Sequence, residues 1–118
     1  MTKLTAFVIE DNPQLSQIFT IALESNFDVV ALTDGDDALS RLDHSPVPRV
    51  VLLDLNLPGV SGSEILSYIR ANERLKDIVV ILTTANERQA ETLQDIADFV
   101  LLKPVSPMQL QQIASRIK

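Results

Sequence analysis

An aspartate at the end of an apolar run is the feature that most constrains this chain. The run extends from Val50 to Leu53, Asp54 follows immediately, and after Leu55 comes the turn sequence of residues 56–59. Successive apolar residues are typical of a strand covered on both faces, as in a parallel sheet. A carboxylate is costly there unless it lies at the strand's exposed carboxyl end or meets a cation. The pattern therefore predicts an α/β fold with Asp54 at the rim of the sheet, where such folds bind ligands.

Short apolar runs alternate with amphipathic segments along the chain. The runs predict strands at Leu4–Ile9, Val29–Leu32, Val50–Leu53, Ile78–Leu82 and Phe99–Leu102. The segments between and after them predict helices, with apolar positions in residues 15–23, 38–42, 65–69, 90–93 and 110–117. Such alternation is typical of a parallel sheet with right-handed crossovers and helices on both faces. Five strands, each followed by a helix, predict a flavodoxin-like, doubly wound sandwich with strand order 2-1-3-4-5. We expect one domain over residues 1–118.

Composition argues against several classes of function. The chain of 118 residues has a net charge of −6, which disfavours direct binding to nucleic acid or to an anionic membrane. Cysteine is absent, so disulfides and thiolate metal sites are not available. The longest apolar run is far too short to span a bilayer, and the first residues show no signal-peptide pattern. We therefore expect a cytoplasmic protein without a membrane partner.

Polar side chains follow four of the five predicted strands. They are Glu10 and Asp11 after the first, Asp54 after the third, Thr83 and Thr84 after the fourth, and Lys103 after the fifth. These strands are neighbours in the expected order and end at one edge, so the side chains should converge. Three carboxylates repel one another unless a cation lies among them, and such oxygen ligands suit Mg²⁺. With a hydroxyl and an ammonium opposite, the layout indicates phosphoryl transfer onto Asp54 as an acyl phosphate.

Each residue also has an ordinary structural explanation. Asp11 alone would be a helix cap or solvated turn, Thr84 alone a turn residue, and Lys103 alone a solvated surface lysine. Their coincidence at one edge is what favours a site.

Two other classes of protein fit the sequence less well. A haloacid-dehalogenase-like phosphatase needs a second acid where Asn56 stands, and an FMN-binding flavodoxin needs a glycine- and hydroxyl-rich loop where residues 10–13 stand.

Four segments carry a family resemblance: Val8–Asn12, Leu52–Gly62, Leu82–Ala85 and the dipeptide Lys103-Pro104. Together they resemble a bacterial two-component response-regulator receiver domain, which implies a CheY-like fold across the whole chain. The resemblance implies that Asp54 takes a phosphoryl group from a histidine kinase or histidine phosphotransfer protein. Such a domain catalyses its own modification and a slow autodephosphorylation, and is not a turnover enzyme. It acts alone or as part of a longer protein.

The resemblance also implies a role for each matching residue. Asp11 would bind Mg²⁺ directly, with Glu10 acting more through water and the main-chain carbonyl of Asn56 as a further ligand. The hydroxyl of Thr84 and the ammonium of Lys103 would hold phosphoryl oxygens. A downstream protein, or a second copy of the chain as a homodimer, would then recognise the modified form.

Two features depart from the family pattern. Val100 stands three residues before Lys103, where receivers usually carry an aromatic ring that changes rotamer. Phe99 beside it is expected to point to the opposite face and into the core. The stretch from Thr84 to Lys103 is about one helical turn shorter than usual, so a short or displaced fourth helix is expected. An alternative function is therefore a receiver-like interaction module that works without phosphorylation.

Overall fold

Five parallel strands form one sheet in the part of the chain that the computed structural model describes, residues 3–44 and 46–117. The strands are β1 Leu4–Ile9, β2 Phe27–Leu32, β3 Val50–Asp54, β4 Val79–Thr84 and β5 Phe99–Leu102. The helices are α1 Pro13–Leu23, α2 Gly35–Leu42, α3 Gly62–Ala71, α4 Glu87–Leu93 and α5 Pro107–Arg116. Strand order is β2-β1-β3-β4-β5. The predicted fold class and strand order are confirmed, while residues 1, 2, 45 and 118 of the expected domain lie outside the described residues.

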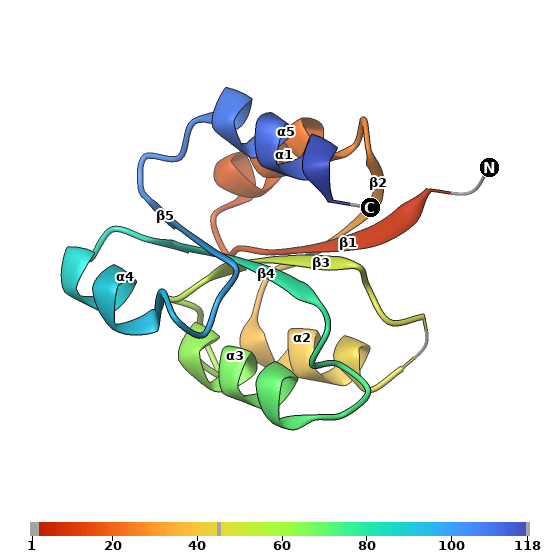
Figure 1. The fold of residues 1–118 in the computed structure, drawn as a ribbon, viewed down its shortest axis with the longest axis vertical. Coiled ribbons are helices and arrows are strands. Elements are labelled where there is room, and N and C mark those ends of the chain that lie inside the picture. Colours follow the sequence, from red (N-terminus) through yellow and green to blue (C-terminus); the bar gives the residue numbers. More distant parts are fainter. Residues whose placement is uncertain (1–2, 45, 118) are drawn as a thin grey trace.

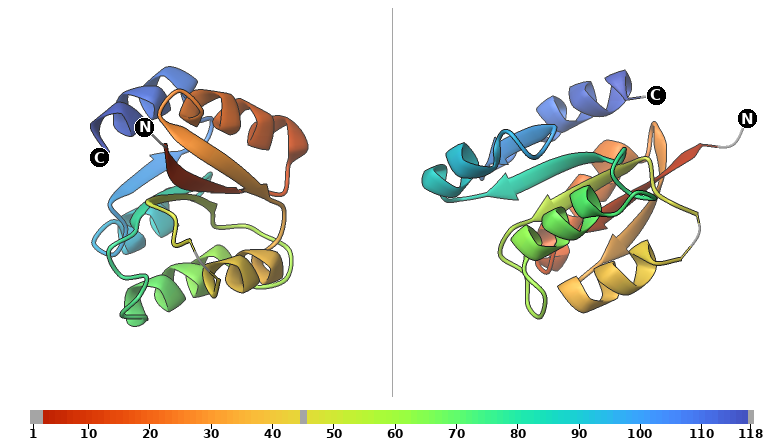
Figure 2. Two further views of the ribbon diagram at one scale, coloured as in Figure 1. Left: turned by 90° about the vertical axis from the view of Figure 1, so that its right-hand side faces the viewer. Right: turned by 60° about the horizontal axis from the view of Figure 1, so that its bottom comes forward.

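Helices cover both faces of the sheet (Figure 1). α1 and α5 lie on one face, and α2, α3 and α4 lie on the other, as the turned views also show (Figure 2). Each face has its own core: Leu52 and Ile81 belong to the α1/α5 side, and Leu53 and Leu82 to the opposite side. Successive strand residues point to opposite faces, and helices cover both faces. Neighbouring residues such as Leu52 and Leu53 are therefore both buried. This explains why β3 reads as a continuous apolar run.

Each helix begins at a side chain that caps its first turn. Asn12, Asp34, Ser61, Asn86 and Ser106 accept main-chain N–H groups from the first turns of α1 to α5 in that order. These caps satisfy donors that the helix itself leaves unpaired, and they fix where the chain leaves the carboxyl edge of the sheet. The longest helix, α1, has 11 residues, and no helix in the described ranges has the length and apolarity needed to cross a membrane.

Some expectations for individual residues were wrong. Ile18, one of the apolar positions in residues 15–23 that predicted α1, shares a helical face with Phe19 but is 42% exposed. Phe99 lies opposite Val100 as expected, but it is 39% exposed and not in the core, because β5 is an edge strand. Val100 is half-buried against the α2/α3/α4 side. β4 also extends to Thr84, so both threonines expected after the strand lie within it.

The connection between β4 and β5 is short, as predicted. α4 has seven residues, all of them described, and none is buried. Arg70 of α3 holds the chain after this helix: its guanidinium donates to the Asp98 carboxylate at 2.8 Å and to the Ile96 carbonyl at 2.8 Å. It also donates to the carbonyls of Lys76 and Ile78, at 2.9 Å each. One cation thus ties α3 to the chain entering β4 and β5.

Candidate functional site

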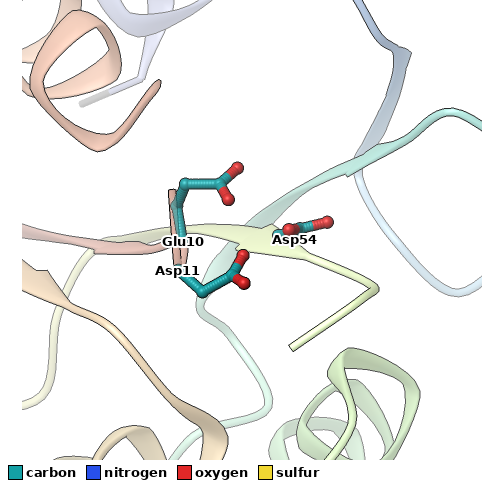
Figure 3. Close-up of side chains that lie close together, drawn as sticks. All are labelled: Glu10, Asp11 and Asp54. Atoms are coloured by element: carbon teal, nitrogen blue, oxygen red, sulfur yellow. The ribbon is translucent and has the colours of Figure 1, made fainter. Parts of the chain in front are cut away.

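Three carboxylates converge at the carboxyl edge of the sheet (Figure 3). Glu10 and Asp11 directly follow β1, and Asp54 is the last residue of β3. One oxygen from each lies within 4.8 Å of the other two. Glu10 and Asp54 are each 2% exposed, whereas Asp11 is exposed. The cluster is therefore buried at Glu10 and Asp54 and open to solvent at Asp11.

Lys103 lies against the buried pair of carboxylates. Its Nζ is 3.3 Å from Oε1 of Glu10 and 3.3 Å from Oδ2 of Asp54. Its main-chain N–H donates to the Thr84 carbonyl at 2.8 Å, which holds the end of β5 beside β4. Burial alone would lower the pKa of Lys103, but the charges of Asp54 and Glu10 outweigh it and raise the pKa above its usual value. The expected approach of Lys103 to the acidic residues is therefore present.

The pKa of Glu10 is shifted by burial and by neighbouring charges. Burial raises its pKa from 4.5 to about 7, opposed by a hydrogen bond from the Asn12 N–H and reinforced by the charge of Asp54. Its Oε1 atom is buried without a hydrogen-bond partner among the described residues, although Lys103 faces it. A hard divalent cation binds such carboxylate oxygens and favours their charged form. The donor set therefore fits Mg²⁺.

Thr84 is oriented toward α4. The residue is fully buried at the end of β4, and its hydroxyl donates to Oε1 of Gln89 at 3.0 Å. The same hydroxyl accepts the Asn86 N–H at 3.1 Å. Neither bond, of those seen within the described residues, reaches the acidic cluster. Sequence reasoning missed Gln89, because a polar residue in a short surface helix gives no signal of an inward contact.

The turn after β3 positions Asp54. The Asn56 N–H donates to Oδ1 of Asp54 at 3.1 Å, which fixes one carboxylate oxygen while Lys103 faces the other. Gly62, at the start of α3, packs against this turn: a Cβ there would lie 2.4 Å from the Asp54 carbonyl oxygen. Only glycine allows α3 to begin this close to the backbone of Asp54. Gly62 ends the Leu52–Gly62 motif, but the sequence alone does not indicate this contact.

Comparisons with known proteins agree on one family. The family model described as "Response regulator receiver domain" matches residues 6–115. The phosphate regulon transcriptional regulatory protein PhoB of Escherichia coli (strain K12) is 32% identical over 115 residues. The match covers 94% of this chain and 48% of PhoB, so the chain spans about half the length of that relative.

Solved structures show the same arrangement of strands and helices. The Mn(2+)-bound form of response regulator Rcp1 is 28% identical, with a TM-score of 0.80, and the match covers 94% of this chain and 88% of that one. The chemotaxis response regulator CheY4 of Vibrio cholerae is 21% identical, with a TM-score of 0.86 and coverage of 99% and 100%. The likeness to CheY4 concerns the fold, and it matches the expectation from the sequence.

Proposed function

Because the chain belongs to the response regulator receiver domain family, we propose that Asp54 is its phosphoacceptor and that a histidine kinase or histidine phosphotransfer protein is the donor. Phosphorylation-dependent signalling is the standard function of this family, and receivers interact with histidine kinases. One observation carries the assignment of Asp54. At the carboxyl edge of the sheet, this buried carboxylate lies 3.3 Å from the ammonium of Lys103, which also lies 3.3 Å from Glu10.

Mg²⁺ is the cation that we assign to the acidic cluster. Asp11, which is exposed, would bind it directly together with Asp54, and Glu10 would act more through water. The main-chain carbonyl of Asn56 would be a further ligand. When bound, the ion neutralises charge on the transferring phosphoryl group. The response regulator Rcp1, which is 28% identical to this chain, has been solved in a Mn(2+)-bound form, and this supports binding of a divalent cation by a protein of this kind.

The residues of the chain itself account for the transfer. A carboxylate oxygen of Asp54 attacks phosphorus, and the bond from phosphorus to the donor breaks with its electron pair leaving on the donor. The Asn56 N–H holds Oδ1 of Asp54, and Lys103 is close enough to move onto the phosphoryl oxygens. Attack of water on phosphorus later releases phosphate and restores the carboxylate. This slow autodephosphorylation is a self-limited reaction and not turnover of a substrate.

The Thr84–Gln89 hydrogen bond supports a route by which modification is sensed. To contact a phosphoryl group on Asp54, the Thr84 hydroxyl must release Gln89, so the site and α4 compete for one hydroxyl. All seven residues of α4 are described, and none of them is buried. A segment with so little buried surface moves at small energetic cost. A downstream protein, or a second copy of the chain, would bind the altered segment.

The cellular setting follows from the same assignment. We place the protein in the cytoplasm and treat residues 1–118 as one receiver domain, acting alone or within a longer protein. Its net charge of −6 disfavours direct contact of this domain with nucleic acid. A relative such as PhoB is a transcriptional regulatory protein about twice as long as the matched region, so DNA contacts would belong to another part of such a protein.

Intact-mass measurement after treatment with acetyl phosphate and Mg²⁺ tests the proposal. We expect the wild type to gain one phosphoryl group, and Asp54→Asn to gain none, because the amide is not a nucleophile. Asp28→Asn, at an exposed position of β2, is a matched control and should be modified like the wild type. A wild type that stays unmodified across Mg²⁺ concentrations would overturn the assignment. It would favour the alternative function, an interaction module that works without phosphorylation.

A further inference from the structure

Thr83 carries a buried hydroxyl that nothing in the described structure satisfies. Within residues 3–44 and 46–117, two buried side-chain oxygens have no hydrogen-bond partner: Oε1 of Glu10 and Oγ1 of Thr83. Glu10 at least faces the ammonium of Lys103, whereas Thr83 is fully buried with its hydroxyl unpaired. An unpaired buried hydroxyl destabilises a fold, and valine would have nearly the same shape without that penalty. The hydroxyl therefore calls for an explanation.

Strand register places Thr83 beside Asp54. β3 and β4 pair Asp54 with Thr83, two positions after the pair Leu52 and Ile81. That earlier pair lies in the α1/α5 core, and alternation brings Asp54 and Thr83 to the same face. Neighbouring strands are about 4.8 Å apart, so the two residues are side by side. Glu10 follows β1 on the other side of β3, so Asp54 stands between a carboxylate and an unpaired hydroxyl.

We propose that Thr83 belongs to the phosphoacceptor site and that its hydroxyl hydrogen-bonds the acyl phosphate formed on Asp54. The inference rests on the proposed function of Asp54. In the unmodified protein the Asn56 N–H and Lys103 face the two carboxylate oxygens of Asp54. When Lys103 follows the new phosphoryl oxygens, the buried oxygen that it leaves needs another donor. Thr83 is the adjacent residue whose donor is unused.

This role gives the two states of the protein a different free energy. A hydroxyl that has no partner before modification and has one afterwards favours the modified state. Thr84 cannot serve in the same way without a cost, because its hydroxyl already contacts both Gln89 and Asn86. Thr83 would therefore lengthen the lifetime of the acyl phosphate, whereas Thr84 would couple it to α4.

Thr83→Val and Thr83→Ser test the proposal. After modification with acetyl phosphate and Mg²⁺ and removal of the donor, we expect the acyl phosphate of Thr83→Val to decay about tenfold faster, the effect of one lost hydrogen bond. Thr83→Ser keeps the hydroxyl and should decay at nearly the wild-type rate. Thr5→Val, in β1 toward the opposite edge of the sheet, is the matched control and should leave the decay unchanged.

Urea unfolding of the unmodified variants separates function from structure. Thr83→Val should be at least as stable as the wild type, because it removes an unpaired buried hydroxyl. A clear loss of stability would show that the hydroxyl has a structural partner, and would overturn the inference. Equal decay of modified wild type and Thr83→Val would also overturn it, and would leave Asp54 as the acceptor. Failure of the wild type to be modified would instead overturn the proposed function.

Discussion

Folding stability should depend on pH through Glu10. Burial raises the pKa of this carboxyl from 4.5 to about 7, so between these values the folded protein holds a proton that the unfolded chain releases. Stability of the metal-free protein therefore falls as pH rises through this range. This loss of stability is absent below about pH 4.5 and complete above about pH 7. The full rise in pKa corresponds to about 3 kcal/mol of unfolding free energy.

Urea unfolding in metal-free buffer, repeated at several pH values from about 4.5 to 8, measures this contribution. Glu10→Gln imitates the neutral carboxyl, so we expect its unfolding free energy not to fall over this pH range. The variant should therefore become more stable relative to the wild type as pH rises. Glu64→Gln replaces an exposed glutamate of α3 and should follow the wild-type curve. Added Mg²⁺ should stabilise the wild type more above pH 7 than below it, because the metal requires the charged carboxylate. Parallel curves for wild type and Glu10→Gln would refute the reasoning.

Three further substitutions test other parts of the structure. Arg70→Met removes four hydrogen bonds worth about 1 kcal/mol each, so we expect urea unfolding to show a loss of about 2–4 kcal/mol, of which the partly exposed pair with Asp98 supplies little. Gly62→Ala forces a Cβ against the Asp54 carbonyl oxygen, and should lower both stability, by about 2 kcal/mol or more, and the yield of phosphorylated protein. Lys103→Met removes the cation that opposes the rise in the pKa of Glu10. The fall in stability should therefore continue to a higher pH than in the wild type, while still beginning near pH 4.5, in the same urea experiment.

The fold and the acidic cluster were predictable because they depend on pattern and topology. The continuous apolar run of β3 requires cover on both faces, and alternation with helices fixes a parallel sheet. Once strand order is set, the carboxyl ends of β1, β3 and β5 meet at one edge. The approach of Glu10, Asp11, Asp54 and Lys103 then follows without any knowledge of side-chain packing.

Contacts that depend on packing between elements were not predictable in this way. The exposure of Phe99 depends on how little of the edge strand β5 the helices cover, and local alternation does not contain that information. Arg70 gives no sequence signal either, because its carbonyl partners are set by the path of the main chain. Thr84 was expected near Asp54, but its hydrogen bond to Gln89 depends on where the short helix α4 begins. Its role toward a phosphoryl group stays a prediction.

The two ends of the shortened β4–β5 connection are held by different means, and this limits where a change at the site can spread. After α4, Arg70 holds both Ile96 and Asp98, and Asp98 also accepts the Val80 N–H at 2.8 Å. Before α4, the Thr84 hydroxyl links β4 to the first turn of the helix through its hydrogen bonds with Gln89 and Asn86. A phosphoryl group that draws Thr84 away therefore loosens the first end while the second stays fixed. Since Val100 has no aromatic ring to change rotamer, we propose that movement of residues 85–93 is how this chain reports phosphorylation.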